Sequence, residues 1–457
     1  MSELRRKALG SGKTVSRKAA SRQSSAASSR ANSRSTSRAN SRAASRANTD
    51  DEGSLSDETT FSLGSVDDLA TIDVELDETT TVWQEELGDR INQIIERKRS
   101  SSVGREESLT AYIRILSAKY AKEEILSKKS ELLDAFVRSL KQGKTEKEAL
   151  LAAKALAITI VTDPEDTLFD RLAPDFKRTI RDHASLPLKN ALIHALGAVA
   201  FYGGASVAET ELIMDFFMEI VESDGHDIGA GDDAGAVTAA LEEWGNLATQ
   251  LEDAEEVTRR SMASLVDQLD SSEILVQVAA GENIALLYEK SYAEAEDDEV
   301  VEDHSESGLG KNFVQKYKPY PRHDDLVHTL RGLSSGSKKY LSKRNKKTQH
   351  SAFVDILHSV ENPMKGPRYS EALDKDNRVR GSRMTVRIHK KGLLRVERWW
   401  KLHRLQHLRR ILAGGFLNHW IENPVIFESL RYVIAYSTTT IKPKLTCCDH
   451  SLFVEEI

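Results

Sequence analysis

The sequence has little cysteine, and its two cysteines, Cys447 and Cys448, are adjacent. Adjacent cysteines cannot close a loop between distant parts of a chain, so a disulfide framework is excluded. Long apolar runs are also missing, since no stretch reaches the roughly 18 apolar residues that a membrane-spanning helix needs. The first residues carry no apolar core of a signal peptide. We therefore expect a cytoplasmic or nuclear protein with no membrane partner.

The sequence also lacks the motifs that accompany enzyme chemistry, such as a Gly-x-Ser-x-Gly turn, a Walker loop or a kinase pattern. His403 and His407 share one face of a predicted helix, but Arg404 stands where a zinc protease carries glutamate. The glycine-rich loop 229–235 contains two aspartates, which repel phosphate and are better suited to capping a helix. We predict no catalysis, no cofactor, no metal and no small-molecule substrate.

What the sequence does have is a sharp division of charge. Residues 209–306 hold 28 Asp and Glu against three Lys and Arg, whereas residues 311–420 hold 26 Lys and Arg against eight Asp and Glu. The net charge of the whole chain, −7, conceals these two blocks. Opposite fields of this size indicate large charged partners rather than a particular fold.

The N-terminal residues are of low complexity. Residues 1–50 are a basic Ser-Arg repeat with a net charge of +10, and residues 51–89 hold 13 acidic residues and no basic ones. So few large apolar residues cannot offset the entropy lost on ordering, which predicts a disordered arm over 1–80. The arm is either a solubilising tail or a phosphorylatable segment that contacts RNA or a nuclear import receptor.

From about residue 81 apolar residues recur every three or four positions, which is the spacing of amphipathic helices. The starts of successive helix pairs are predicted 37 to 47 residues apart, at Ser108, Thr145, Ser185, Asp232 and Ser271. This period is typical of HEAT and armadillo repeats. We therefore predict an all-α fold with an armadillo/HEAT-like α-solenoid over 81–293. An irregular helical bundle is the alternative.

An acidic linker is predicted over 294–310, followed by a basic, mainly helical C-terminal domain over 311–435 and a tail over 436–457. Within the basic domain, MTVRI and LLRVER flank His389-Lys390-Lys391-Gly392 and predict a short hairpin. The range 397–412 predicts a helix that ends at Gly414-Gly415.

Three clusters of cations follow one another in this domain, with aromatic residues between them. Nucleic-acid binding needs cations for phosphates and flat side chains for bases, so the clusters predict contact with a ribosome or structured RNA. A solvated helix face or a nuclear import signal is the alternative, and docking on the acidic block is a third. The predicted contact residues are Lys338, Lys339, Lys343, Arg344, Lys346, Lys347, Arg383, Arg387, Lys390, Lys391, Arg398, Lys401, Arg404, Arg409 and Arg410.

The segment LHRLQHLRRILAGGFLNHWIENPVIFESL (402–430) is the most specific text in the chain. It resembles the C-terminal signature of the interferon-related developmental regulator family, in which a basic helix precedes a small-residue turn, an apolar pair and a histidine-containing turn. Segments 140–162 and 190–204 resemble the helical repeats of that family, so the resemblance spans about 80–430. The matching motif residues are Leu405, Gln406, His407, Leu408, Gly415, His419, Glu422 and Asn423.

The resemblance implies an armadillo-like scaffold that regulates other molecules without catalysing a reaction. It implies two roles, binding of idle ribosomes in translation control and transcriptional co-regulation through corepressor complexes. We expect the first role for the basic domain. The alternative is a nuclear co-regulator that binds regulatory protein complexes through the helical repeats.

Overall fold

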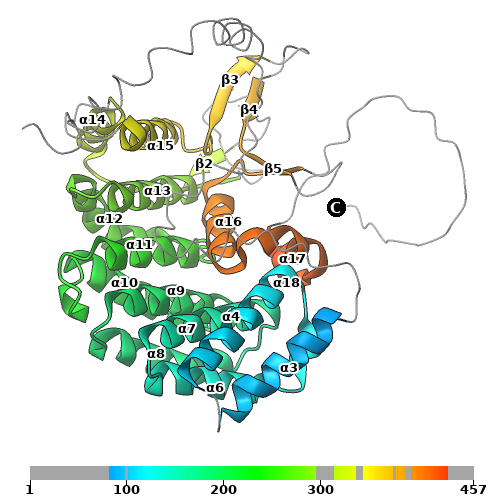
Figure 1. Cartoon of the computed structure of the whole chain (residues 1–457). Coiled ribbons are helices and arrows are strands. Elements are labelled where there is room, and N and C mark those ends of the chain that lie inside the picture. Colours follow the sequence, from blue (N-terminus) through cyan, green and yellow to red (C-terminus); the bar gives the residue numbers. More distant parts are fainter. Residues whose placement is uncertain are drawn as a thin grey trace, which may run out of the picture. The chain divides into compact units, whose positions relative to one another are not determined.

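In the described part of the chain, six pairs of antiparallel helices stack in two layers (Figure 1). In each pair the first helix lies in an outer layer and the second lies in an inner layer, where it packs against the inner helices before and after it. The outer helices are α3 (Val82–Glu96), α6 (Lys129–Gln142), α8 (Leu168–Asp182), α10 (Val207–Glu222), α12 (Glu255–Asp267) and α14 (His323–Ser334). The inner helices are α4 (Ser102–Ala118), α7 (Glu146–Thr162), α9 (Leu186–Tyr202), α11 (Ala234–Ala248), α13 (Ile274–Lys290) and α15 (Lys343–Glu361). The predicted all-α solenoid is confirmed.

These elements come from a computed structural model. It describes residues 82–97, 101–294, 313–335, 343–373, 377, 379–387 and 393–430, and gives backbone alone for 294, 343–345, 380, 387 and 393. The predicted arm, the predicted tail and most of the predicted linker lie outside the described residues. No helix in the described part of the chain is long and apolar enough to cross a membrane.

Four of the five predicted pair starts lie within two residues of the N-cap of an inner helix. Thr145 and Ser185 are N-caps of α7 and α9, and their side chains accept hydrogen bonds from backbone N–H groups three residues on. The cap of α11 is Asp233, one residue from the prediction, whereas Ser108 lies inside α4. The predicted spacing of the helix pairs was therefore right, but the predicted start of each pair was wrong. Each predicted start lies in or at the second helix of a pair and not at the first.

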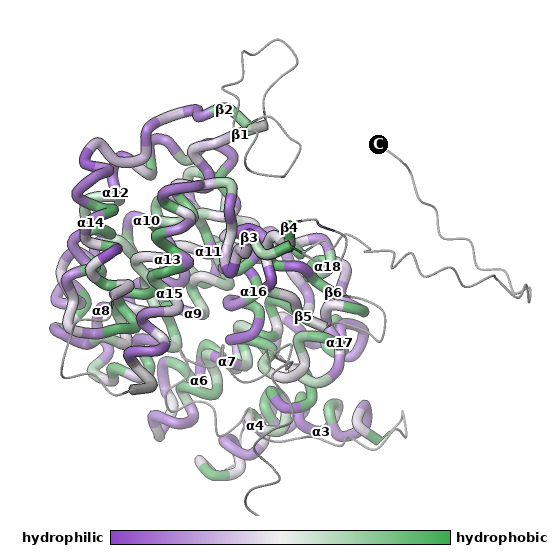
Figure 2. Tube along the Cα trace, turned by 90° about the horizontal axis from the view of Figure 1, so that it is seen from above, coloured by the Kyte–Doolittle hydropathy of each residue, from purple (hydrophilic) through white to green (hydrophobic). Residues whose placement is uncertain are grey.

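The two layers differ in composition for a physical reason. Inner helix α7 is buried on nearly every side, and its alanines allow neighbouring backbones to approach. Outer helix α8 buries one stripe, which includes Leu172, Phe176 and Ile180, and exposes the rest. Figure 2 shows this mixture of hydrophilic and hydrophobic residues along the outer helices.

After α13, the described residues also form three short antiparallel strand pairs and, at their C-terminal end, three helices. The pair β5 (Thr385–Arg387) with β6 (Leu393–Arg395) is the predicted hairpin. The pairs β1 (Tyr292–Glu294) with β2 (Phe313–Gln315) and β3 (Tyr369–Leu373) with β4 (Val379–Ser382) were not predicted. Helix α16 (Trp399–Leu412) ends in the short turn η6 (Ala413–Gly415), as predicted, and α17 (Phe416–Glu422) and α18 (Pro424–Ser429) follow.

Helix α16 packs across the inner layer, where it contacts α4, α7, α11 and α13 (Figure 1). Residues predicted to belong to the basic domain thus share a core with the helical repeats. The boundaries at 293 and 310 stay predictions from composition.

Candidate functional site: the C-terminal helices on the inner layer

Helix α16 begins on a buried carboxylate of the inner layer. The N–H of Trp399 donates to Glu289 Oε2 at 2.8 Å, and the N–H of Trp400 donates to Oε1 at 3.3 Å. The carboxylate of Glu289, which belongs to α13, therefore lies against the first turn of α16, where the helix dipole favours negative charge. Burial raises the pKa of Glu289, against the opposing effects of Arg398 and these two N–H groups. The contact joins residues more than a hundred positions apart.

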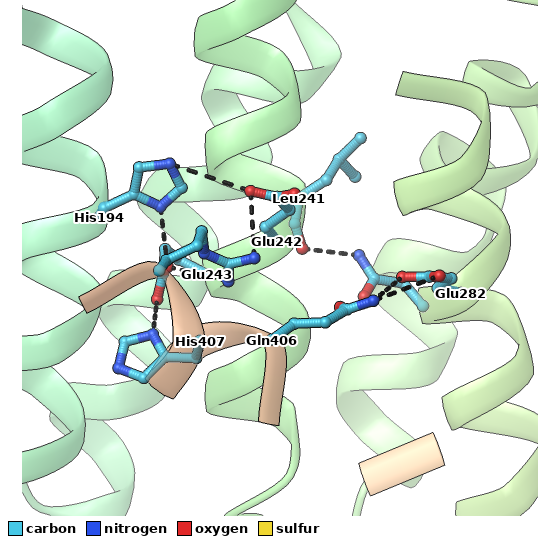
Figure 3. A network of polar contacts seen from close by, with 9 residues as sticks. His194, Leu241, Glu242, Glu243, Glu282, Gln406 and His407 are labelled. Carbon is cyan, nitrogen blue, oxygen red and sulfur yellow. Dashed lines mark hydrogen bonds and ion pairs between the residues drawn. The ribbon is translucent and has the colours of Figure 1, made fainter. Parts of the chain in front are cut away.

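A second buried carboxylate, Glu243 of α11, lies at the centre of the site (Figure 3). His407 Nδ1 lies 2.8 Å from Glu243 Oε2, while His194 Nδ1 and Arg410 Nη2 lie 2.9 and 3.2 Å from Oε1. The other amino group of Arg410 reaches Glu242 at 3.3 Å. Burial alone would raise the pKa of Glu243, but the charge of His407, hydrogen bonds from both histidines and the charge of Arg410 lower it below its ordinary value. The carboxylate is therefore ionised and paired.

Two glycines of the inner layer make room for this network. A Cβ atom added to Gly197 of α9 would lie 2.2 Å from Glu243 Oε2. A Cβ atom added to Gly245 of α11 would lie 2.1 Å from Asn283 Oδ1 and 2.6 Å from the ring of His403. Any side chain at either position would push the acid or the docked helix away.

A third carboxylate, Glu282 of α13, faces Gln406. The amide nitrogen of Gln406 lies 3.2 Å from Glu282 Oε2, and His403 Nε2 lies 3.4 Å from the Glu282 carbonyl oxygen. Burial raises the pKa of Glu282 to about 7, although Gln406 opposes the shift. Burial also lowers the pKa of His403 to about 4. The histidine is therefore neutral near pH 7, and Glu282 is only partly ionised there.

Replacing Glu282 with glutamine is expected to change how stability depends on pH. A carboxyl group whose pKa is raised by folding makes the protein less stable as the pH rises through the window between its unfolded and folded values, here about 4.5 to 7. Above that window Glu282→Gln should be more stable than the native chain, and the difference should fade toward pH 5. Urea unfolding of both proteins at several pH values measures it. Exposed Glu422→Gln is the control, and a difference that does not vary with pH would contradict the assignment.

The next helices supply hydrogen-bond donors to the C-terminal ends of inner helices. His419 Nε2 donates to the Leu116 carbonyl at 2.7 Å, and Asn418 donates to the Ala118 carbonyl at 2.8 Å, both at the end of α4. Asn423 donates to the Val161 carbonyl of α7 at 3.0 Å. The last carbonyls of a helix lack partners within it, so these donors satisfy groups that would otherwise have no partner in the protein.

Arg404 joins the end of α11 in the same way. Its guanidinium donates to Thr249 Oγ1 at 2.9 Å and to the Thr249 carbonyl at 3.3 Å, and it also reaches the Ser429 carbonyl at 3.1 Å. Its central carbon lies 5.3 Å from the ring centre of Phe201 and 5.1 Å from that of Trp400. The side chain is thus fully used inside the molecule.

Most of the motif residues are therefore internal. Gly415 and His419 are buried between α17 and α4, while Leu405 and Leu408 are buried in α16. Glu422 is exposed. The other motif residues, Gln406, His407 and Asn423, make the contacts given above.

The predicted RNA-contact residues divide into groups. Lys401, Arg404 and Arg410 make contacts within the chain, and Arg409 is half-buried. Lys347 and Arg383 are exposed, and Lys346 and Arg398 are half-buried. Lys338, Lys339, Lys390 and Lys391 lie outside the described residues, as do the side chains of Lys343, Arg344 and Arg387. RNA contact by these residues stays a prediction.

The sequence analysis missed the partners of α16. Glu243, Glu282 and Glu289 lie in apolar, alanine-rich helices, where an acidic residue is unusual. That was the available signal, but Glu243 follows Glu242 and Glu289 precedes Lys290, so the sequence does not show which acid faces inward. Among the described residues no group of three or more His, Cys, Asp or Glu side chains is arranged to hold a metal ion.

Comparison with known proteins shows which family and which sequences this chain resembles. The sequence profile described as Interferon-related developmental regulator matches residues 48–361, which is more than half of the chain. An uncharacterized protein of Schizosaccharomyces pombe is 27% identical over 380 residues, covering 82% of this chain and 78% of that protein. Interferon-related developmental regulator 1 of Mus musculus is 24% identical, covering 78% of this chain and 73% of that protein. The same regulator of Sus scrofa is 25% identical, covering 63% of this chain and 62% of that protein.

The matched range ends before α16. The family profile thus covers all six helix pairs that the structure describes, together with the acids that hold α16, but not the motif 402–430 itself. That the motif is a family signature stays a prediction.

Proposed function

Because the chain belongs to the interferon-related developmental regulator family, we propose that it is a regulatory binding protein that acts in translation control by holding ribosomes or structured RNA. It performs this role without catalysing a reaction. The solenoid serves as the frame, and the basic C-terminal part supplies the contact surface.

The observation that carries the proposal is the division of cations in the C-terminal part. Arg404 and Arg410 are used within the chain, whereas Arg383 and Arg395 point to solvent from the strand region 379–395. Neither exposed arginine lies within ion-pair distance of a carboxylate in the part of the chain that the structure describes. Exposed, uncompensated cations are what a polyanion with its phosphates outward can use.

Sedimentation in sucrose gradients tests this function. The chain should travel with ribosomal particles at low salt, and six phosphate contacts would lower the affinity about 10³-fold or more between about 50 and 200 mM salt. Arg383→Glu combined with Arg395→Glu should move the chain to the top of the gradient at low salt. The control is Arg178→Glu with Arg259→Glu, which reverses two exposed cations on outer helices. Native chain absent from every ribosomal fraction at low salt would overturn the proposal.

A second function, transcriptional co-regulation through protein complexes, is favoured by the outer helix α10. Val207 and Leu212 are 65% and 61% exposed there, among acidic residues such as Glu211 and Asp215. Exposed apolar side chains with acidic neighbours suit a basic protein partner better than RNA. In the same gradients this function predicts that the chain stays at the top at low salt.

A further inference from the structure

Where α13 meets α16 (Figure 1), cations from three separate segments lie near one another, and two of them flank the ring of Trp400. Lys401 Nζ and the guanidinium carbon of Arg404 lie 5.5 and 5.1 Å from the centre of that ring. The guanidinium of Arg398 lies 5.4 Å from the ring centre of Phe313 in β2. The cations are Lys290 at the end of α13, Lys316 after β2, and Arg398, Lys401 and Arg404 of the α16 segment.

The segments are held together by backbone contacts. The N–H of Lys316 donates to the Ser291 carbonyl at 2.8 Å, directly after Lys290. Lys290 Nζ donates to the Leu251 carbonyl at 2.5 Å. The cluster is therefore fixed by α13 and β2 as well as by α16, and it includes two lysines that the sequence clusters did not contain.

Two carboxylates of the described residues lie beside this cluster, and both already have partners. Glu289 is occupied by the N–H groups of Trp399 and Trp400, and Glu397 pairs with Lys401 at 2.7 Å. In the described part of the chain neither Lys316 nor Arg398 lies within ion-pair distance of a carboxylate. Glu289 and Glu397, the acids beside Arg398 and Lys401, are therefore already engaged.

Lys290 shows the effect of this crowding. Burial lowers its pKa to about 8, Glu289 opposes the shift, and the charges of Arg404 and Lys316 add to it. Cations held this close repel one another unless an anion lies among them. A bound phosphate would relieve the repulsion and favour the protonated lysine.

We propose that Lys290, Lys316 and Arg398 hold phosphate groups of structured RNA beside the partly exposed ring of Trp400. This inference rests on the proposed function and adds the place of contact. Arg404 and Lys401 position the ring, because their own hydrogen bonds are satisfied within the chain. RNA fits better than an acidic peptide because the site combines cations with the half-buried flat rings of Trp400 and Phe313, and unpaired bases stack on rings of this kind.

Fluorescence anisotropy of the full chain with a labelled RNA hairpin of known sequence tests the site. Lys316→Gln combined with Arg398→Gln should weaken binding on the order of tenfold at low salt, and should reduce the slope of log affinity against log salt by about one per lost contact. Because Arg398 is half-buried, Lys316→Gln alone is measured too, together with the urea unfolding curve of each variant. Arg178→Gln with Arg259→Gln is the matched control and should leave affinity and slope unchanged.

The outcomes separate this inference from the function on which it rests. If the native chain binds neither the hairpin nor ribosomes, both fall. If the native chain binds the hairpin and the Lys316 and Arg398 variants bind with the same affinity and slope, while Arg383→Gln with Arg395→Gln weakens binding, only the Trp400 site is overturned. Equal affinity for polyglutamate would overturn the assignment to RNA.

Discussion

Replacing Glu243 with glutamine is expected to lower the free energy of unfolding by about 3–5 kcal/mol, the usual cost of removing one partner from a buried ion pair. Glu243 is fully buried, and nitrogen atoms of His407, His194 and Arg410 lie 2.8 to 3.2 Å from its carboxylate oxygens. A neutral amide cannot balance the charge that these groups keep. The loss should therefore exceed that of one hydrogen bond, which is about 1 kcal/mol.

Urea unfolding followed by circular dichroism measures the loss. The matched control is Glu219→Gln on outer helix α10, since Glu219 also pairs with an arginine, Arg181, but both side chains are about half exposed. That control should cost about 0–1 kcal/mol. A second comparison changes Glu243, His407 and Arg410 together to apolar residues of similar size, which should recover much of the stability. Equal losses for Glu243→Gln and Glu219→Gln would show that α16 does not dock on this carboxylate.

The helical repeats were predictable because their signals are local. Helix caps and apolar spacing both depend on neighbours within about four residues. The structure confirms the caps at Thr145 and Ser185. The phase of the pairs was not predictable from the same signals, because outer helices also carry caps. Ser206, for example, forms a complete capping box with Glu209 at the start of outer helix α10.

The position of α16 depends on contacts that spacing cannot reveal. Arginines on several sides of the helix suggest a polyanion around it, and Arg404 and Arg410 do meet acceptors on different sides. The acceptors belong to the same chain, about 155 to 167 positions earlier. Nothing in the sequence distinguishes inward-facing Glu243 from its neighbour Glu242. The sequence therefore predicts only the net negative charge of the acidic block, and not which of its acids are buried.

The division of charge consequently has two parts with different roles. A few acids of the 209–306 block, chiefly Glu243 and Glu289, neutralise or cap α16 from inside. Exposed acids such as Glu211 and Asp215 pair on the surface or meet solvent. The basic block also contains two kinds of residue. Cations such as Arg404 and Arg410 are bound within the chain, and only the cations that face solvent are available to a partner.

Gly415 should be the position in the motif that tolerates a side chain least. A Cβ atom there would lie 1.6 Å from the carbonyl oxygen of Ser117 and 2.5 Å from its carbon, so the clash is with the backbone of α4. Side-chain rotation cannot relieve it. Gly415→Ala must separate α17 from α4 and break the bonds from His419 and Asn418 to the last carbonyls of that helix.

We expect Gly415→Ala to cost about 3 kcal/mol, at the upper end of what overpacking usually costs. The chain contains its own control, since a Cβ atom at the adjacent Gly414 would meet nothing within 4 Å. Gly414→Ala should change the free energy of unfolding by no more than about 0.5 kcal/mol, as exposed substitutions do. Two adjacent glycines that differ this much in urea unfolding would establish that the motif turn is pressed against the inner layer. If Gly415→Ala lowers the free energy of unfolding no more than Gly414→Ala does, α17 is not docked on α4. His419 and Asn418 then do not donate to the last carbonyls of α4.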